Sequence, residues 1–129
     1  MYNMLNKFLD NNKSEFYFAF RLIVGLMFAL HGAIKLGLTG GPVETGLMLL
    51  AGIIELVAGL AIVFGAYIGI AAVVAGLEML YIVVFVFLPD GINPLETGAE
   101  VALLYLAAFL VLATVGAGKW TVGNPGMKK

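Results

Sequence analysis

Four long runs of hydrophobic residues, separated by short breaks, make up most of the chain. A transmembrane helix needs about 20 consecutive apolar residues, because each residue advances the helix by about 1.5 Å and the hydrocarbon core is about 30 Å thick. Each run is close to that length. The pattern therefore predicts four membrane-spanning helices over residues 16–36, 45–64, 66–88 and 97–115.

The breaks between these runs contain residues that end or begin helices. Three glycines and Pro42 separate the first two runs, and Gly65 allows a tight reversal between the second and the third. Residues 89–94 include two prolines and a glycine, which are typical of a turn. Ser14 is the predicted cap of the first long helix.

The first dozen residues form an amphipathic pattern. Their apolar members recur at helical spacing: Met1, Met4, Leu5, Phe8 and Leu9. We expect a short helix over residues 1–13 that lies in the membrane interface, with a disordered tail as the alternative. The predicted fold class is thus all-α, an integral membrane four-helix transmembrane bundle that forms a single domain over residues 1–129.

Basic residues outside the spans precede the first span or follow the fourth: Lys7, Lys13, Lys119, Lys128 and Lys129. Because cytoplasmic segments are enriched in basic residues, both termini are predicted to be cytoplasmic. Tyr17, Tyr67 and Trp120 fall at the same boundary, as an aromatic belt would.

Composition agrees with a membrane protein and excludes several functions. The residues are 62% hydrophobic and 12% charged, whereas a soluble domain is about half apolar and a quarter charged. A net charge of -1 without a basic cluster gives no basis for binding nucleic acid. There is no cysteine, and His31 is the single histidine, so one chain offers no histidine pair for haem. No dinucleotide fingerprint or metal-ligand cluster occurs in the sequence, so no haem, flavin or metal site is evident.

Two acidic residues lie near the middle of predicted spans. Glu55 is about ten residues from either end of the second span, and Glu78 is similarly central in the third. A charge at this depth costs several kcal/mol, so it is expected to face the interior, find a partner and indicate a functional site. Alternatively, each carboxyl group is protonated or hydrogen-bonded and only stabilises helix packing.

The first span carries Arg21, His31 and Lys35 within an arc of about 80°. These three residues form one polar stripe that we expect to face the bundle interior. Arg21 and Lys35 could instead extend to the headgroups at opposite ends of the helix, and His31 could bind a backbone carbonyl.

Small residues surround both buried carboxylates and predict close helix contacts there: Ala51, Gly52, Ala58 and Gly59 near Glu55, and Ala71 and Ala75 on the face of Glu78. At the start of the fourth span, residues 93–96 and 97–100 each match a capping box, of which only one can cap the span. The carboxylate left over, Glu96 or Glu100, would lie at a depth that allows an ion pair with Lys35.

Several of these features occur in one order along the chain: Arg21, His31-Gly32, Lys35, a glycine-rich loop, the segment Glu55-Leu-Val-Ala-Gly-Leu60, and Glu100 opening a span that ends in Gly116-Ala-Gly118. This order, over residues 16–120, resembles the DoxX family. The resemblance implies a small four-helix protein of a bacterial or archaeal cell membrane, often tied to quinone redox chemistry, thiosulfate oxidation or oxidative-stress complexes. Glu78 matches no feature of the family.

The first functional hypothesis is a quinone or quinol site on a subunit of a membrane oxidoreductase. His31 and Glu55 are the candidate catalytic groups, for donation and proton relay. The candidate ligand-binding residues are Arg21, His31, Lys35, Glu55, Glu78, Tyr81, Glu100 and Tyr105. A quinone is the expected cofactor, and the expected partners are membrane lipid, a separate redox protein and a second copy of the chain.

Two other hypotheses stay open. The basic stripe could line the path of a small anion or acid through a carrier or channel. The protein could also be a non-catalytic anchor that assembles a larger complex.

Overall fold

A computed structural model describes residues 1–121, and this part of the chain is helical without any β-strand. The helices are α1 (Tyr2–Asn11), α2 (Lys13–Lys35), α3 (Leu47–Phe64), α4 (Ile68–Ile82), α5 (Pro94–Thr97) and α6 (Glu100–Val115). After Ile82, α4 continues as a π-helical turn, Val83–Phe87, and a 3₁₀ turn, Leu88–Asp90. The all-α prediction is confirmed for the described residues.

Three helical segments are long and apolar enough to cross a membrane: Lys13–Lys35, Leu47–Phe64 and Ile68–Asp90. They correspond to the first three predicted spans. The fourth predicted span is also an apolar helix, but α6 has only 16 residues and begins at Glu100 rather than at Thr97. At about 1.5 Å per residue it extends about 24 Å, less than the roughly 30 Å of a hydrocarbon core.

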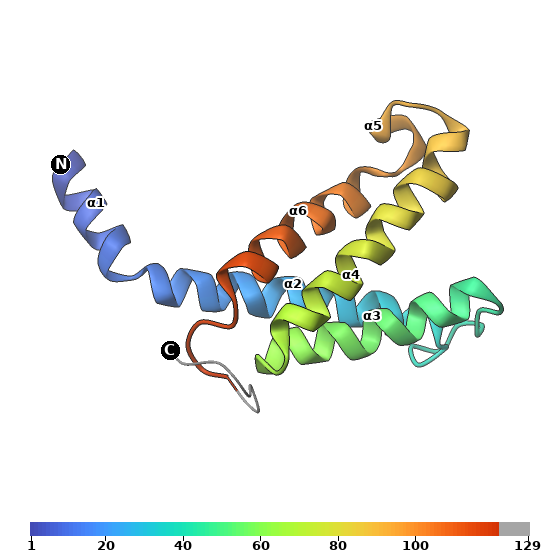
Figure 1. Ribbon diagram of the computed structural model, residues 1–129, viewed down its shortest axis with the longest axis horizontal. Helices are drawn as coiled ribbons and strands as arrows, with labels where there is room; N and C mark the ends of the chain where they lie inside the picture. Colours follow the sequence, from blue (N-terminus) through green and yellow to red (C-terminus); the bar gives the residue numbers. More distant parts are fainter. Residues whose placement is uncertain (122–129) are drawn as a thin grey trace.

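The long helices are arranged as two pairs (Figure 1). Contacts are most extensive between α2 and α3 and next between α4 and α6, whereas α2 and α6 hardly meet. Figure 1 shows the two pairs diverging away from the end where α2 begins and α6 finishes. Near the meeting end, Phe28, Ile62, Phe109 and Leu112 fill the core and are almost fully buried.

Glycines allow the backbones of α2 and α3 to approach closely. A Cβ atom on Gly32 would lie 2.3 Å from the backbone nitrogen of Leu56, and one on Gly59 would lie 2.4 Å from that of Ala29. No real Cβ contact is so short, so only glycine fits at these two positions. The close packing predicted around Glu55 is confirmed.

Two predicted helix starts are wrong. Asn12, not Ser14, stands at the start of α2; its backbone N–H and side-chain amide both donate to the carbonyl of Phe8, which also closes α1. Because α1 runs almost directly into α2, Ser14 lies inside a helix and has no end to cap.

The two predicted capping boxes before the fourth span do not cap that span either. The Asn93 side chain accepts a hydrogen bond of 3.0 Å from the backbone of Leu95 and caps the short helix α5, which Gly98 ends in a left-handed conformation. Thr97 is the last residue of α5, and its hydroxyl accepts from the backbone of Ala99 at 3.4 Å. Neither box therefore caps α6, whose N-cap is Ala99.

Candidate functional site

An ion pair between α2 and α3 lies where the two helix pairs diverge. The ammonium nitrogen of Lys35 is 2.8 Å from Oε1 of Glu55, and the Glu55 side chain is almost fully buried. Gly52 and Gly32 make this geometry possible, because a Cβ atom on Gly52 would lie 2.8 Å from the Cβ of Lys35. Lys35 thus points into the bundle rather than toward headgroups.

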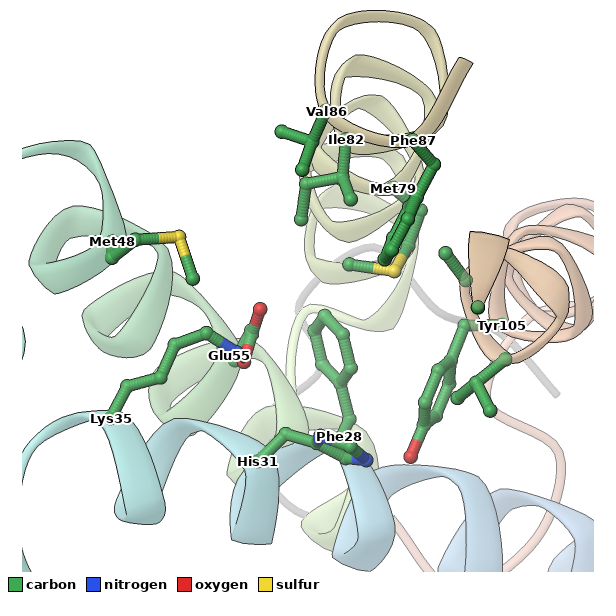
Figure 2. A pocket seen from close by; sticks show the side chains of 13 residues that line it. Phe28, His31, Lys35, Met48, Glu55, Met79, Ile82, Val86, Phe87 and Tyr105 are labelled. Carbon is green, nitrogen blue, oxygen red and sulfur yellow. Dashed lines mark hydrogen bonds and ion pairs between the residues drawn. The ribbon is translucent and has the colours of Figure 1, made fainter. Parts of the chain in front are cut away.

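The ion pair lines a cavity of about 280 Å³ between the two helix pairs. Figure 2 shows the lining side chains converging on this space from α2, α3, α4 and α6. The lining residues are Phe28, His31, Lys35, Met48, Glu55, Met79, Ile82, Val86, Phe87, Gly98, Val101, Ala102 and Tyr105. Most of the wall is apolar and carries only a few polar groups, which is the usual make-up of a ligand pocket.

His31 on α2 and Tyr105 on α6 add two further polar groups to the wall of the cavity. Their rings lie 5.6 Å apart between centroids and are perpendicular. Tyr105 also packs against Phe28 and Phe109, with centroid distances of 5.1 and 5.8 Å. In Figure 2 its hydroxyl group lies on the side of His31. The structure therefore brings together His31, Lys35, Glu55 and Tyr105, four of the predicted ligand-binding residues.

The π-helical turn after α4 forms another part of the wall. Val86 and Phe87 belong to this turn and line the cavity together with Ile82 just before it. A π-helical turn changes the direction of side chains along a helix and is frequent at functional sites. Sequence analysis missed these residues, because an apolar run of valine and phenylalanine carries no signal for a π-helical turn.

Glu78 on α4 lies outside the cavity wall but close to its ion pair. Both carboxylate oxygens are buried, and neither has a hydrogen-bond partner among residues 1–121. A negative charge on Glu78 would be repelled by the carboxylate of Glu55 and attracted by the ammonium group of Lys35. Glu78 is thus a neighbour of the ion pair and does not line the cavity, and its predicted role in ligand binding stays a prediction.

Arg21 lies away from the cavity, near the other end of α2, and it is 1% exposed. Its guanidinium group donates to four backbone carbonyls, at 2.7 to 3.1 Å: those of Val63, Ala117, Lys119 and Trp120. Phe18 lies under the guanidinium at 4.9 Å. The predicted polar stripe is therefore divided, with Arg21 holding the segment after α6 against the bundle.

Tyr81 and Glu100, two other predicted ligand-binding residues, are exposed and do not line the cavity. Tyr81 packs against Phe85, with 4.8 Å between ring centroids. The predicted ion pair of Lys35 with Glu96 or Glu100 is replaced by the pair with Glu55, which is nearer along the shared helix interface. Within residues 1–121, no group of three or more histidine or acidic side chains is arranged to hold a metal ion.

The chain is similar to one protein of Haemophilus influenzae. The two sequences are 34% identical over 131 aligned positions, which cover 94% of this chain and 98% of the relative. That relative is described only as an uncharacterized protein. No family model matches the chain, and no solved structure matches it.

Proposed function

The chain belongs to the same family as the uncharacterized Haemophilus influenzae protein, and from this premise we propose that it binds a quinone or quinol in the cavity between the two helix pairs. One observation carries the proposal. An apolar cavity holds a lysine–carboxylate pair, a histidine and a tyrosine hydroxyl on its walls, and these come from α2, α3 and α6. The order of polar motifs that resembles the DoxX family supports the same function.

The size and chemistry of the cavity suit a quinone ring. Ligand pockets usually have volumes of about 300 to 1,000 Å³, so a cavity of about 280 Å³ lies near the lower end of that range and suits a single ring. A quinone presents two carbonyl oxygens, for which Lys35, His31 and Tyr105 are hydrogen-bond donors. Its isoprenoid tail would leave between the diverging helix pairs toward lipid.

Glu55 and His31 are the proposed proton-exchanging groups, because both line the cavity and both can take up or release a proton. Electrons would come from a separate redox protein, which makes this chain a subunit of a membrane oxidoreductase. The carrier hypothesis has less support than it had from sequence. Arg21 is bound to backbone carbonyls and Lys35 to Glu55, so the basic stripe does not form a continuous path for an anion.

We propose further that the protein crosses a bacterial cell membrane four times, with both termini in the cytoplasm. In this arrangement α6 is the fourth crossing. Because α6 is shorter than the hydrocarbon core is thick, α5 and its flanking turns span the rest of that thickness. The apolar side of α1, with Leu5 and Phe8 exposed, would lie in the interface. Because the chain has no cysteine, single cysteines at Asn3, Leu38 and Ile92 can be labelled from either side. Labelling of Asn3 from the cytoplasm and of the other two from outside is expected.

The quinone proposal is tested by purifying the protein in native lipid and measuring co-purified quinone by mass spectrometry. Wild type should retain quinone. His31→Ala should reduce it by about tenfold, as expected for loss of one hydrogen-bond donor, and Glu55→Gln should reduce it because it removes the carboxylate that holds Lys35 at the cavity. Glu44→Gln, which changes an exposed loop carboxylate, is the matched control and should have no effect. Absence of quinone from wild type, with quinol turnover unchanged in both site variants, would refute the proposal and favour an anchor.

A further inference from the structure

Glu78 is a buried ionisable residue that takes no part in the proposed binding of the ligand. Its two carboxylate oxygens are shielded from solvent and make no hydrogen bond of normal geometry within the described chain, and the carboxyl group within their reach is that of Glu55. It projects from α4, the first part of the segment Ile68–Asp90, whose buried residues are apolar and include Ala75 and Met79. An ionised carboxylate without a partner in such a place is strongly unfavourable, and a group in this position gives up its charge.

The charges around Glu78 do not balance if every group is ionised. Lys35 contributes one positive charge, and it is already paired with Glu55 at 2.8 Å. Glu55 and Lys35 are the charged groups that act on Glu78, so a second negative charge would face Glu55 without a second cation. Arg21 cannot be this second cation, because its guanidinium group donates to four backbone carbonyls near the opposite end of α2.

We propose that Glu55 and Glu78 share one proton, so that Lys35 and the two carboxyl groups together are neutral, and that Glu78 is the store from which this proton reaches the cavity. When an oxygen of a bound ligand takes up a proton, the shared proton moves from the hydroxyl of the Glu78 carboxyl group to Glu55 and from Glu55 to that oxygen. Both carboxyl groups are then carboxylates, and their cluster with Lys35 carries one negative charge until it takes up another proton from water. Glu78 is then a positioning and proton-storing residue that acts through Glu55. The shared proton requires only the two carboxyl groups. Its transfer to a ligand additionally requires the proposed function.

The geometry supports this division of roles. Glu55 lines the cavity, and Glu78 does not. The two residues stand on different helices, α3 and α4, so the shared proton connects the α2–α3 pair to the α4–α6 pair beside the space where these pairs separate. A change in the protonation of the pair would thus alter the contact between the two halves of the bundle.

Infrared spectroscopy of the purified full-length protein in lipid bilayers tests the shared proton. At neutral pH, wild type should show a C=O stretch of a protonated carboxyl group that shifts in D₂O. This band should be lost in Glu78→Gln and retained at a shifted frequency in Glu78→Asp. It should also be lost in Glu55→Gln, because Glu78 then ionises and takes Glu55's place beside Lys35. Glu44→Gln, in an exposed loop, should leave the band unchanged.

The proposal is overturned if wild type shows no such band, or if the band survives in Glu78→Gln or in Glu55→Gln. A band that appears only when sodium is replaced by a bulky organic cation would also overturn it, since a metal ion would then neutralise the pair. Circular dichroism of each variant shows whether the fold is kept, and Glu78→Asp provides the test if Glu78→Gln does not fold. Quinone content is measured on the same samples. Quinone without the band refutes the shared proton alone, and the band without quinone refutes the proposed ligand alone.

Discussion

The ammonium group of Lys35 and the carboxylate of Glu55 form an ion pair of 2.8 Å, although Lys35 is the last residue of α2 and Glu55 lies in the middle of α3. Helical side chains lean toward the N-terminus of their own helix, so a lysine at the C-terminal end of α2 extends back toward the centre of the bundle. The pair therefore closes one wall of the cavity instead of reaching the headgroups.

Lys35→Met should destabilise the protein because it leaves Glu55, whose side chain is only 2% exposed, without its cation. Removing one partner of a buried pair costs about 3 kcal/mol. The free energy of unfolding, measured by titration with a denaturing detergent, should fall by about this amount. The double variant Lys35→Met with Glu55→Gln should recover part of the loss, because no unpaired charge remains. Equal losses in the single and double variants would show that the pair contributes nothing through its charge.

Gly32→Ala should separate α2 from α3, because the added Cβ would meet the backbone of Leu56 at 2.3 Å and a backbone cannot move aside locally. Such overpacking costs about 1 to 3 kcal/mol. Gly69→Ala is the matched control: Gly69 is also in a membrane-length helix, but nothing lies within 4 Å of the Cβ that it would gain. The control should be neutral or slightly stabilising. Thermal unfolding in detergent compares the two variants, and equal effects would contradict the close contact.

Much of this fold is predictable from the sequence because its signals are local. Runs of about 20 apolar residues predict the long helices, and small residues such as Gly59 around Glu55 predict close packing. The hydrogen-bond partners of Arg21 could not be predicted from such local signals. Its position on the same face as His31 and Lys35 follows from helical periodicity, but its partners are backbone carbonyls, which every residue has and no sequence pattern identifies.

The cavity is less predictable than the helices for a related reason. Helical spacing identifies the buried charges and the close helix contact, but it did not identify Glu55 as the partner of Lys35. The cavity depends in addition on the angle at which the two helix pairs diverge. That angle is a property of packing over the whole bundle. Tyr81 and Tyr105 were equivalent candidates in the sequence, and only the orientation of α4 and α6 decides that Tyr105 lines the cavity.

Arg21→Met should release the segment after α6, because this segment is held through hydrogen bonds to the carbonyls of Ala117, Lys119 and Trp120. Loss of these bonds to a charged donor should cost about 3 kcal/mol. Limited trypsin digestion should then cut after Lys119 several times faster than in wild type, while cutting after Lys7 in the exposed helix α1 is unchanged. Arg21→Lys should not restore protection, since one ammonium group cannot replace a planar group that reaches four carbonyls. Loss of quinone without faster cutting would instead support the ligand-binding role predicted from the sequence.

Tyr105→Phe and Tyr81→Phe form a matched pair that tests whether the cavity is the ligand site. Each variant removes one hydroxyl group from an aromatic residue, but Tyr105 lines the cavity beside His31, and Tyr81 is exposed and packs against Phe85. A hydrogen bond from a tyrosine hydroxyl contributes about 1 kcal/mol, so Tyr105→Phe should weaken the binding of a short-tailed quinone by about fivefold. Tyr81→Phe should leave the dissociation constant unchanged.

Equilibrium binding to the protein in lipid nanodiscs measures both constants under the same conditions. Because phenylalanine keeps the ring that packs against Phe28 and Phe109, a weaker constant for Tyr105→Phe reports the hydroxyl rather than a rearranged core. An equal loss in both variants would indicate a general effect on the bundle. A loss confined to Tyr81→Phe would place the ligand on the outer face of α4, and the cavity would then lose its role, because no quinone could contact Lys35 and Glu55 from that side.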